Sequence, residues 1–155
     1  MTHEQELLSA LAKTTFRLNG QFLAVGEELA QPAGLTAALW QVLGAVLGSP
    51  RSVADVAREI GVTRQSVQRV ADVLVDRGLA EYQPNPAHRR AKLLTPTAEG
   101  RQAIRRIGPA HAAFAQRLAE EFGTGALEVS LATVAHLSQA LEQLGGPRRA
   151  LRAAG

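Results

Sequence analysis

The chain of 155 residues has no cysteine and few histidines. Without cysteine it can form no disulfide framework, no thiolate metal site and no thiol redox switch. The four histidines are scattered along the chain: His3, His88, His111 and His136. No cluster of His, Asp and Glu has the spacing of metal ligands, so the sequence predicts neither a metal site nor another cofactor.

Long apolar runs and catalytic motifs are also missing. No run approaches the roughly 20 apolar residues of a membrane span, and the polar start from Met1 to Gln5 is not typical of a signal peptide. We therefore expect a cytoplasmic chain with no membrane partner. The sequence has no G-x-S-x-G or H-E-x-x-H motif, no phosphate loop and no dinucleotide fingerprint, so an enzyme is the disfavoured alternative.

The positive charge of the chain is small and local. Seventeen Lys and Arg residues against 14 Asp and Glu residues give a formal net charge of only +3. A local basic patch suits a protein that binds DNA at one surface better than it suits a general polycation. The length fits one domain with a real hydrophobic core.

Two short amphipathic helices are predicted on either side of Gly61. Ser52 and Thr63 stand where helix N-caps are expected, and Asp55 could complete a capping box with Ser52. Gly78 would end the second helix. The apolar residues in each helix recur at i, i+3, i+4 and i+7: Val53, Val56, Ala57 and Ile60, then Val67, Val70, Ala71 and Leu74. This pattern predicts a helix-turn-helix whose second helix is the recognition helix.

The exposed face of the second helix is polar, and a basic hairpin is predicted to follow it. Residues 79–83 and 91–94 are expected to form two strands joined by a Pro-rich tip, which together make a wing. Other globular proteins carry two helices and a hairpin with solvated charges, but here the polar helix face and the basic wing agree on one ligand. The side chains predicted to contact double-stranded DNA are Ser52, Thr63, Arg64, Gln65, Ser66, Gln68, Arg69, His88, Arg89, Arg90 and Lys92.

These motifs resemble the MarR family of bacterial regulators across the centre of the chain. The segments that carry the resemblance are LTAALWQVL at 35–43, GVTRQSV at 61–67, DRGL at 76–79, HRRAKL at 88–93 and LTPTAEG at 94–100. The resemblance implies a mostly α fold with a small β-hairpin wing, in which a winged helix-turn-helix is flanked by N- and C-terminal dimerisation helices.

The flanking helices show long apolar seams. Leu8, Leu11, Thr15, Leu18, Phe22, Val25 and Leu29 step by three and four along a first helix that ends before Gln31. A helix from Ala37 to Leu47, capped by Thr36, is apolar on more than one face and should be enclosed.

The chain after the wing predicts two more helices. Thr95 is the expected cap of the first, with Pro96 at its first position, and Gly108-Pro109 should interrupt and bend it. Residues 123–125 break the chain before the last helix, which should end at 145–147, and a frayed tail would follow. Their seams contain Ile104, Ile107, His111, Phe114, Leu118 and Phe122, then Leu127, Leu131, Val134, Leu137, Leu141 and Leu144.

Nothing predicted within one copy covers these seams, so a second copy should. The expected interface residues are Leu8, Leu11, Leu18, Phe22, Leu118, Leu131, Leu137 and Leu141. The resemblance implies a two-fold homodimer that presents recognition helices to half-sites about one helical turn, ~34–36 Å, apart. The predicted divisions of this single compact domain are 1–34 and 96–146 for dimerisation, 35–95 for DNA binding, and 147–155 as the tail.

Release by a small molecule is implied by the resemblance alone. Many members of the family bind an anionic or phenolic effector between the dimer helices and the winged lobe, and then leave DNA. The candidates here are Phe16, Asn19, Trp40, His111 and Phe114. Trp40 and His111 also have a simpler interpretation as core residues, with the histidine bonded to a carbonyl. The lack of cysteine argues against the peroxide-sensing branch of the family.

The wing departs from the family at His88, where an aspartate commonly precedes the Arg-Arg pair. An aspartate could hold an arginine by a charge-assisted hydrogen bond, and a neutral histidine cannot. We expect Arg89 or Arg90 to enter a minor groove at an A·T-rich flank and protonation of His88 to strengthen binding. The sequence thus predicts a sequence-specific transcriptional regulator, with repression favoured. An effector-independent architectural DNA-binding protein and a protein-interaction module remain open alternatives.

Overall fold

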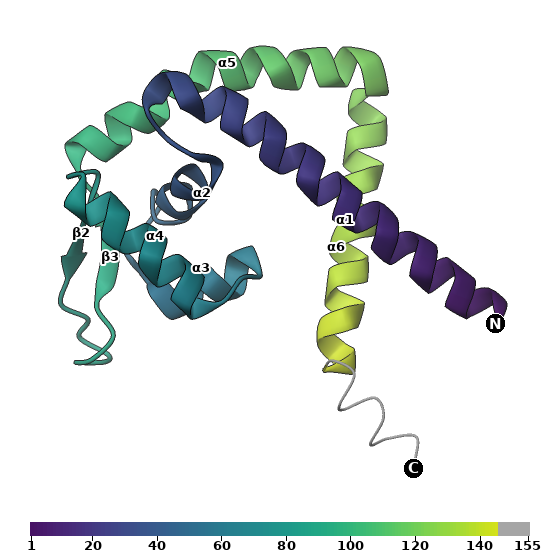
Figure 1. Cartoon of the computed structure of the whole chain (residues 1–155), viewed down its shortest axis with the longest axis horizontal. Coiled ribbons are helices and arrows are strands. Elements are labelled where there is room, and N and C mark those ends of the chain that lie inside the picture. Colours follow the sequence, from purple (N-terminus) through teal and green to yellow (C-terminus); the bar gives the residue numbers. More distant parts are fainter. Residues whose placement is uncertain (146–155) are drawn as a thin grey trace. The chain divides into compact units, whose positions relative to one another are not determined.

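The computed structural model describes residues 1–145, which form a mostly helical chain with a small antiparallel sheet (Figure 1). In order, the elements are α1 (His3–Ala30), the short 3₁₀ helix η1 (Gln31–Ala33), α2 (Ala37–Ala45), β1 (Arg51–Ser52), α3 (Val53–Ile60), α4 (Arg64–Asp76), β2 (Ala80–Gln83), β3 (Leu93–Pro96), α5 (Ala98–Phe122) and α6 (Thr124–Leu144). The predicted fold class, helices with a winged helix-turn-helix, is confirmed. The predicted tail at 147–155 lies outside the described residues.

The chain divides into two compact units within α5, between His111 and Ala112. The hydrophobic core belongs to the first unit, where α2 packs against α1, α3 and α4, and α4 packs against β2. Its largest fully buried side chains are Leu43, Val46, Val56, Val67, Leu74, Leu94 and Ile107. In the second unit no residue from 112 to 145 is buried. None of the helices within residues 1–145 is long and apolar enough to cross a membrane.

The helix-turn-helix forms with the predicted caps. Ser52 Oγ accepts from the Asp55 backbone N–H at 3.1 Å, and Thr63 Oγ1 accepts from that of Ser66 at 3.1 Å. Gly61 and Gly78 have φ values of 80° and 71°, the left-handed conformation that ends a helix at glycine. Only the serine half of the predicted capping box forms, because the Asp55 carboxylate accepts from Arg58 instead.

The sheet differs from the predicted hairpin in two respects. A third strand, β1, pairs with β3 on the side away from β2, and Ser52 lies opposite Leu93. The second wing strand covers 93–96 rather than 91–94, so Thr95 and Pro96 belong to it and the predicted helix start there is wrong. Thr97 takes the capping role, since its Oγ1 accepts from the Gly100 N–H at 3.1 Å and donates to the Gly78 carbonyl at 2.6 Å.

Three other helix boundaries also differ from the prediction. α2 ends at Ala45 rather than Leu47, and it is enclosed only in part, because the face with Ala38, Gln41 and Gly44 is exposed. α5 runs without interruption through Pro109, although proline removes one backbone donor from the helix. Gly123 alone, with a φ of 98°, separates α5 from α6.

Candidate nucleic-acid interface

Helix α4 presents a polar face to solvent while its apolar face packs in the core. Val67, Ala71 and Leu74 are buried, which fixes the rotation of the helix about its axis. The opposite face, beginning at the first turn, carries the predicted side chains, of which Ser66 is half-buried and the others are exposed: Arg64, Gln65, Ser66, Gln68 and Arg69. Arginine and glutamine side chains in the N-terminal half of a helix can hold phosphates and reach base edges.

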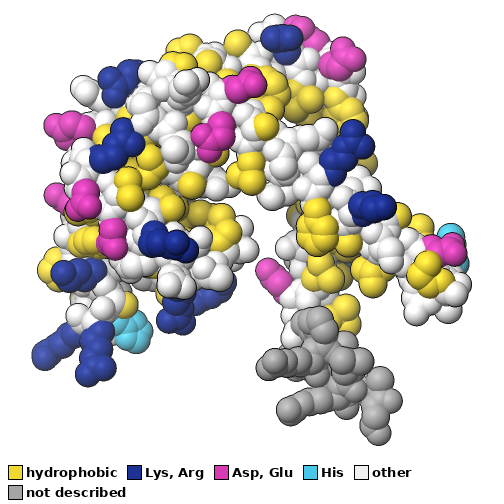
Figure 2. Space-filling view, in the orientation of Figure 1, with side chains coloured by type: hydrophobic (Ala, Val, Ile, Leu, Met, Phe, Trp, Pro, Cys, Tyr) yellow, Lys and Arg dark blue, Asp and Glu magenta, His cyan; other side chains and the backbone are white. Residues whose placement is uncertain are grey.

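The wing brings a second set of cations to the same unit. Its tip turns at Asn85, whose Oδ1 accepts from the Ala87 backbone N–H at 3.0 Å. His88, Arg89 and Arg90 follow and are all exposed. Figure 2 shows Lys and Arg side chains gathered over the end of this hairpin, beside a histidine. An exposed basic tip of this kind suits contact with a polyanion.

The recognition helix and the wing border one hollow of about 550 Å³. Arg64, Gln65 and Gln68 line it from α4, and Arg90 and Lys92 line it from the wing. The structure thus brings together five predicted DNA-binding side chains from two elements. Arg89 lines a neighbouring hollow with Lys92, and the remaining predicted residues, Thr63, Ser66, Arg69 and His88, border neither hollow. Their contacts with DNA stay predictions.

Two predicted contacts come from hydroxyl groups that already have a structural role. Ser52 also borders the hollow of α4 and the wing, but it is buried and its Oγ caps α3. The hydroxyl of Thr63 caps α4 in the same way. Each oxygen still has a proton to donate, so a contact with phosphate stays a prediction for both.

A polar link joins α4 to the wing and was not predicted from the sequence. Gln68 Nε2 donates to Asp72 Oδ1 at 3.0 Å and to Tyr82 Oη at 2.8 Å, and the tyrosine hydroxyl donates to the same aspartate oxygen at 2.7 Å. Burial, followed by the hydrogen bond and charge of Asp72, raises the pKa of Tyr82 to about 12. The ammonium nitrogen of Lys92 lies 6.0 Å from the centroid of the tyrosine ring, within the range of a cation–π contact.

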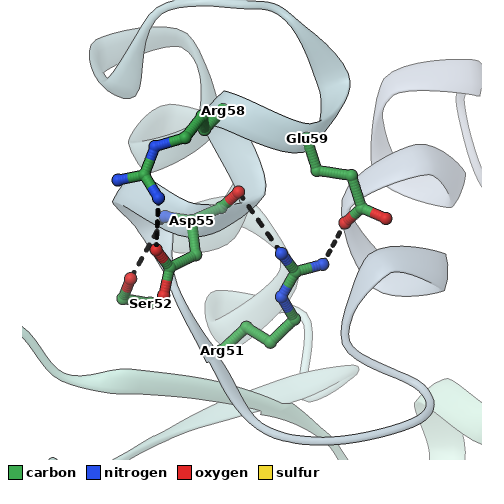
Figure 3. A network of polar contacts seen from close by, with 5 residues as sticks. All are labelled: Arg51, Ser52, Asp55, Arg58 and Glu59. Atoms are coloured by element: carbon green, nitrogen blue, oxygen red, sulfur yellow. Dashed lines mark hydrogen bonds and ion pairs between the residues drawn. The ribbon is translucent and has the colours of Figure 1, made fainter.

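A second polar network joins β1 to both ends of α3 (Figure 3). The guanidinium of Arg51 pairs with the Glu59 carboxylate and donates to the Asp55 carbonyl at 3.5 Å. Arg58 donates to the Asp55 carboxylate at 3.1 Å. These two arginines are engaged by acidic partners. The cations of α4 and the wing have no such partner within residues 1–145, so they are better suited to phosphate.

Comparison with known proteins identifies the family. A family model described as MarR family matches residues 33–91. The uncharacterized protein Rv2011c of Mycobacterium tuberculosis is 37% identical over 135 residues, which cover 87% of this chain and 94% of that protein. The chain belongs to the MarR family.

Solved structures agree with this assignment. The transcriptional repressor CouR, bound to a 23-mer DNA duplex, matches with a TM-score of 0.74 and 25% identity over 89% of this chain and 99% of its own. The M. tuberculosis regulator MosR, in complex with DNA, shares the fold with a TM-score of 0.69 and 24% identity over 83% of this chain and 96% of its own. The family consists of transcription regulators rather than enzymes, and this MarR-family chain has their winged-helix DNA-binding fold.

The predicted effector residues of this MarR-family chain only partly come together. Asn19 and Trp40 line a hollow of about 320 Å³ between α1 and α2, whose other lining residues are Phe22, Leu23, Gly26, Ala37, Gln41 and Gly44. The ring of His111 meets that of Trp40 edge-on, with centroids 5.4 Å apart. Phe16 is 76% exposed and lies outside this hollow. Phe114 lines a hollow of the second unit.

The interpretation of His111 as a core residue is wrong, and that of Trp40 is only partly right. The His111 side chain is exposed and forms no hydrogen bond within residues 1–145. Trp40 is half-buried. The last buried residue on the apolar stripe of α5 is Ile107, one turn before His111. Within residues 1–145, no group of three His, Asp or Glu side chains could hold a metal ion.

The predicted dimer residues of this MarR-family chain are mostly uncovered. Phe22 of α1 is 60% exposed and Leu131 of α6 is 73% exposed. Leu118 and Leu137 are half-buried, and the remaining predicted interface residues are exposed: Leu8, Leu11, Leu18 and Leu141. Three further exposed apolar side chains on the same helices were not predicted: Leu7, Leu23 and Val129. Apolar faces of this extent are typical of surfaces that bind a partner.

Proposed function

We propose that this MarR-family regulator represses transcription by binding a pseudo-palindromic operator as a homodimer. The hollow between α4 and the wing carries the proposal, because Arg64, Gln65 and Gln68 on one element face Arg90 and Lys92 on the other. In the proposed complex, α4 enters the major groove by its N-terminal half and the wing reaches the adjacent minor groove. The proposed binding to an operator implies that the protein acts in the cytoplasm, where bacterial DNA lies.

The distribution of charge along α4 supports this orientation. Its cations, Arg64 and Arg69, lie in the first half, whereas its carboxylates, Asp72 and Asp76, lie in the second. A helix that entered a groove by its C-terminal half would bring both carboxylates to the phosphates. The proposed orientation keeps them away and adds the partial positive charge of the helix N-terminus to the contact.

The homodimer follows from the uncovered apolar faces. A second copy would cover the seam of α1 and that of α6, each of which is continuous along its helix. In this proposal, residues 1–34 and 96–146 serve dimerisation and residues 35–95 form the DNA-binding lobe. The similarity to the repressor CouR supports repression as the outcome of binding.

The hollow between α1 and α2 supports regulation by a small aromatic or phenolic effector. Its walls combine two aromatic rings, Phe22 and Trp40, with two amides, Asn19 and Gln41, and its volume suits a single-ring compound. Phe22 belongs also to the proposed dimer seam. An effector that displaces Phe22 would therefore change the spacing of the two recognition helices, and so release DNA.

Selection of duplexes from a random pool by the full chain tests the proposal. We expect an enriched inverted repeat. Gln65→Ala and Arg69→Ala should weaken the selected site more than random DNA, by about 1–3 kcal/mol for each lost bidentate base contact. The exposed Gln102→Ala on α5 serves as control and should bind like wild type. Binding without an enriched sequence would favour the architectural alternative, and no binding at all would favour an interaction module.

Thermal-shift screening of aromatic acids tests the effector. A compound that raises the melting temperature and releases the selected duplex should lose both effects in Trp40→Ala. Phe16→Ala is the matched control, since it removes an aromatic ring of α1 that lies outside the hollow. If the compound lost both effects in Phe16→Ala but kept them in Trp40→Ala, the effector site would lie outside this hollow.

A further inference from the structure

Three side chains from α4 and β2 form a closed triangle of hydrogen bonds. Gln68 Nε2 lies 3.0 Å from Asp72 Oδ1 and 2.8 Å from Tyr82 Oη, and those two oxygens are 2.7 Å apart. Gln68 and Asp72 are one turn apart on α4, while Tyr82 is in the wing strand opposite Leu94. The triangle therefore joins the recognition helix to the wing at a single glutamine.

The chemistry of the partners sets which end of the Gln68 amide faces them. A carboxylate oxygen can only accept, and the one proton of the tyrosine hydroxyl is directed to that oxygen. The third corner must then donate to both, which only the amide nitrogen can do. Turning the amide over would place its carbonyl oxygen against the carboxylate with no proton between them, an unfavourable contact.

The orientation leaves the carbonyl oxygen of Gln68 as its available group. Within residues 1–145 no hydrogen bond uses Gln68 Oε1. The residue is exposed and borders the hollow shared by α4 and the wing, together with Gln65 and Lys92. The triangle thus presents an acceptor at the surface proposed to meet the major groove.

We infer that Asp72 and Tyr82 are positioning residues that fix the Gln68 amide so that it presents its carbonyl oxygen to the DNA bases. This inference rests on the proposed function. An outward carbonyl accepts from the amino group of adenine or cytosine, and it is repelled by the major-groove acceptors of guanine and thymine. A glutamine free to rotate would instead adapt to a donor or an acceptor.

The inference also explains a carboxylate beside a DNA-binding surface. Asp72 lies next to Gln68 in the second half of α4, so its negative charge weakens the general attraction of DNA to this surface although no phosphate contacts it in the proposed orientation. Its loss would strengthen binding to any DNA while weakening the choice of base. The triangle therefore lowers the affinity for DNA of any sequence and raises the selectivity at one base pair of each half-site.

The test compares the full-length wild type with Asp72→Asn and Tyr82→Phe. For each protein, affinity is measured for the selected operator and for duplexes that carry every base pair at each half-site position, and thermal melting checks the fold. Tyr82→Phe keeps the ring over which Lys92 lies and removes only the hydroxyl. Glu120→Gln is the matched control, because Gln116 Nε2 donates to Glu120 Oε1 at 3.0 Å in the same i,i+4 arrangement on α5.

We expect the wild type to prefer adenine or cytosine at one position, by roughly 2- to 12-fold for one hydrogen bond. Asp72→Asn should abolish or reverse that preference, because the new amide can donate to a reversed Gln68. Tyr82→Phe should reduce the preference, and Glu120→Gln should leave it unchanged. Preferences at all other positions should stay the same in every variant.

An unchanged base preference in a folded Asp72→Asn variant would overturn the inference while leaving the proposed function intact. An equal loss of base preference at every half-site position would also overturn it, since that result indicates a structural role only. A wild type that selects no sequence would overturn the proposed function, and this inference with it.

Discussion

Helices α4 and α6 have similar apolar periodicity but opposite exposed surfaces. α4 buries Val67, Ala71 and Leu74, and the side chains left outside are mostly polar or charged. α6 buries none of its 21 residues, and large apolar side chains remain uncovered, including Leu131, Val134 and Leu141. The chain thus satisfies the apolar stripe of α4 by itself and leaves that of α6 for another surface.

This contrast separates two kinds of partner. A polar face with arginines gains little from burial against an apolar surface, but it gains hydrogen bonds and counterion release against a polyanion. An exposed apolar face gains roughly 25 cal/mol per Å² that is removed from water. The difference supports the proposal that α4 binds DNA and that α6 binds a protein surface.

The largest expected effect comes from a charge in a seam. Leu137→Asp on α6 or Leu18→Asp on α1 would bury a carboxylate without a partner, so we expect monomers or unfolded chains in analytical ultracentrifugation. DNA affinity should fall with the dimer, since one half-site supplies half of the contacts. Gln139→Asp, at an exposed position outside the α6 seam, is the control and should remain dimeric. A stable dimer in either seam variant would remove that seam from the interface.

The next effect concerns the wing. Replacing Arg89 and Arg90 together by Ala should flatten the salt dependence of DNA binding, by roughly 0.9 in the slope of log K against log salt for each lost phosphate contact. The matched control is Arg105→Ala with Arg106→Ala, an adjacent pair of exposed arginines on α5. Equal slopes for wild type and the wing variant would show that the wing does not touch DNA.

A smaller effect is expected in the titration of Tyr82, the one tyrosine of the chain. Its pKa is raised from 10.0 to about 12, first by burial and then by Asp72. Because the folded pKa lies above the ordinary value, the neutral phenol stabilises the fold fully below about pH 10, and this contribution is lost as the pH rises through about 12. Asp72→Asn should lower the pKa in an ultraviolet absorbance titration. An unchanged midpoint would mean that the aspartate bond is absent in solution.

The smallest expected effect belongs to His88. Protonation adds one positive charge to the exposed tip of the wing, so DNA affinity should rise a few-fold as the pH falls from about 8 to about 6. His88→Asp should remove the rise. His136→Asp, on α6, changes a histidine far along the sequence from the wing and should keep it. A pH response that persists in the His88 variant would assign it to another group.

Local signals account for what the sequence predicted correctly. Caps at Ser52 and Thr63 and helix ends at Gly61 and Gly78 depend on residues only a few positions apart, so the helix-turn-helix could be predicted closely. The strand β1 could not be predicted, because two residues are too few to show an alternation of apolar and polar side chains. Thr95-Pro96 fits the start of a helix as well as the end of a strand, and pairing with β2 decides for the strand.

The parts of the candidate site that were missed depend on tertiary contacts. The spacing of Gln68 and Asp72 suggests a pair on one helix face, but nothing in the sequence places Tyr82 beside them. His111 lies on the apolar stripe of α5, yet its burial depends on which residues pack against it, and the contact with the Trp40 ring leaves it exposed.

The spacing of the half-sites tests most directly whether two copies of α4 read DNA together. After selection of the operator, its two halves are moved apart by about five base pairs, half a turn of B-DNA, and by about ten, a full turn. A rigid dimer should lose most of its specific affinity for the half-turn duplex, because one recognition helix would then face the wrong side of the DNA. Equal affinity for the original and the half-turn duplex would contradict the account, since each copy would then bind its half-site alone.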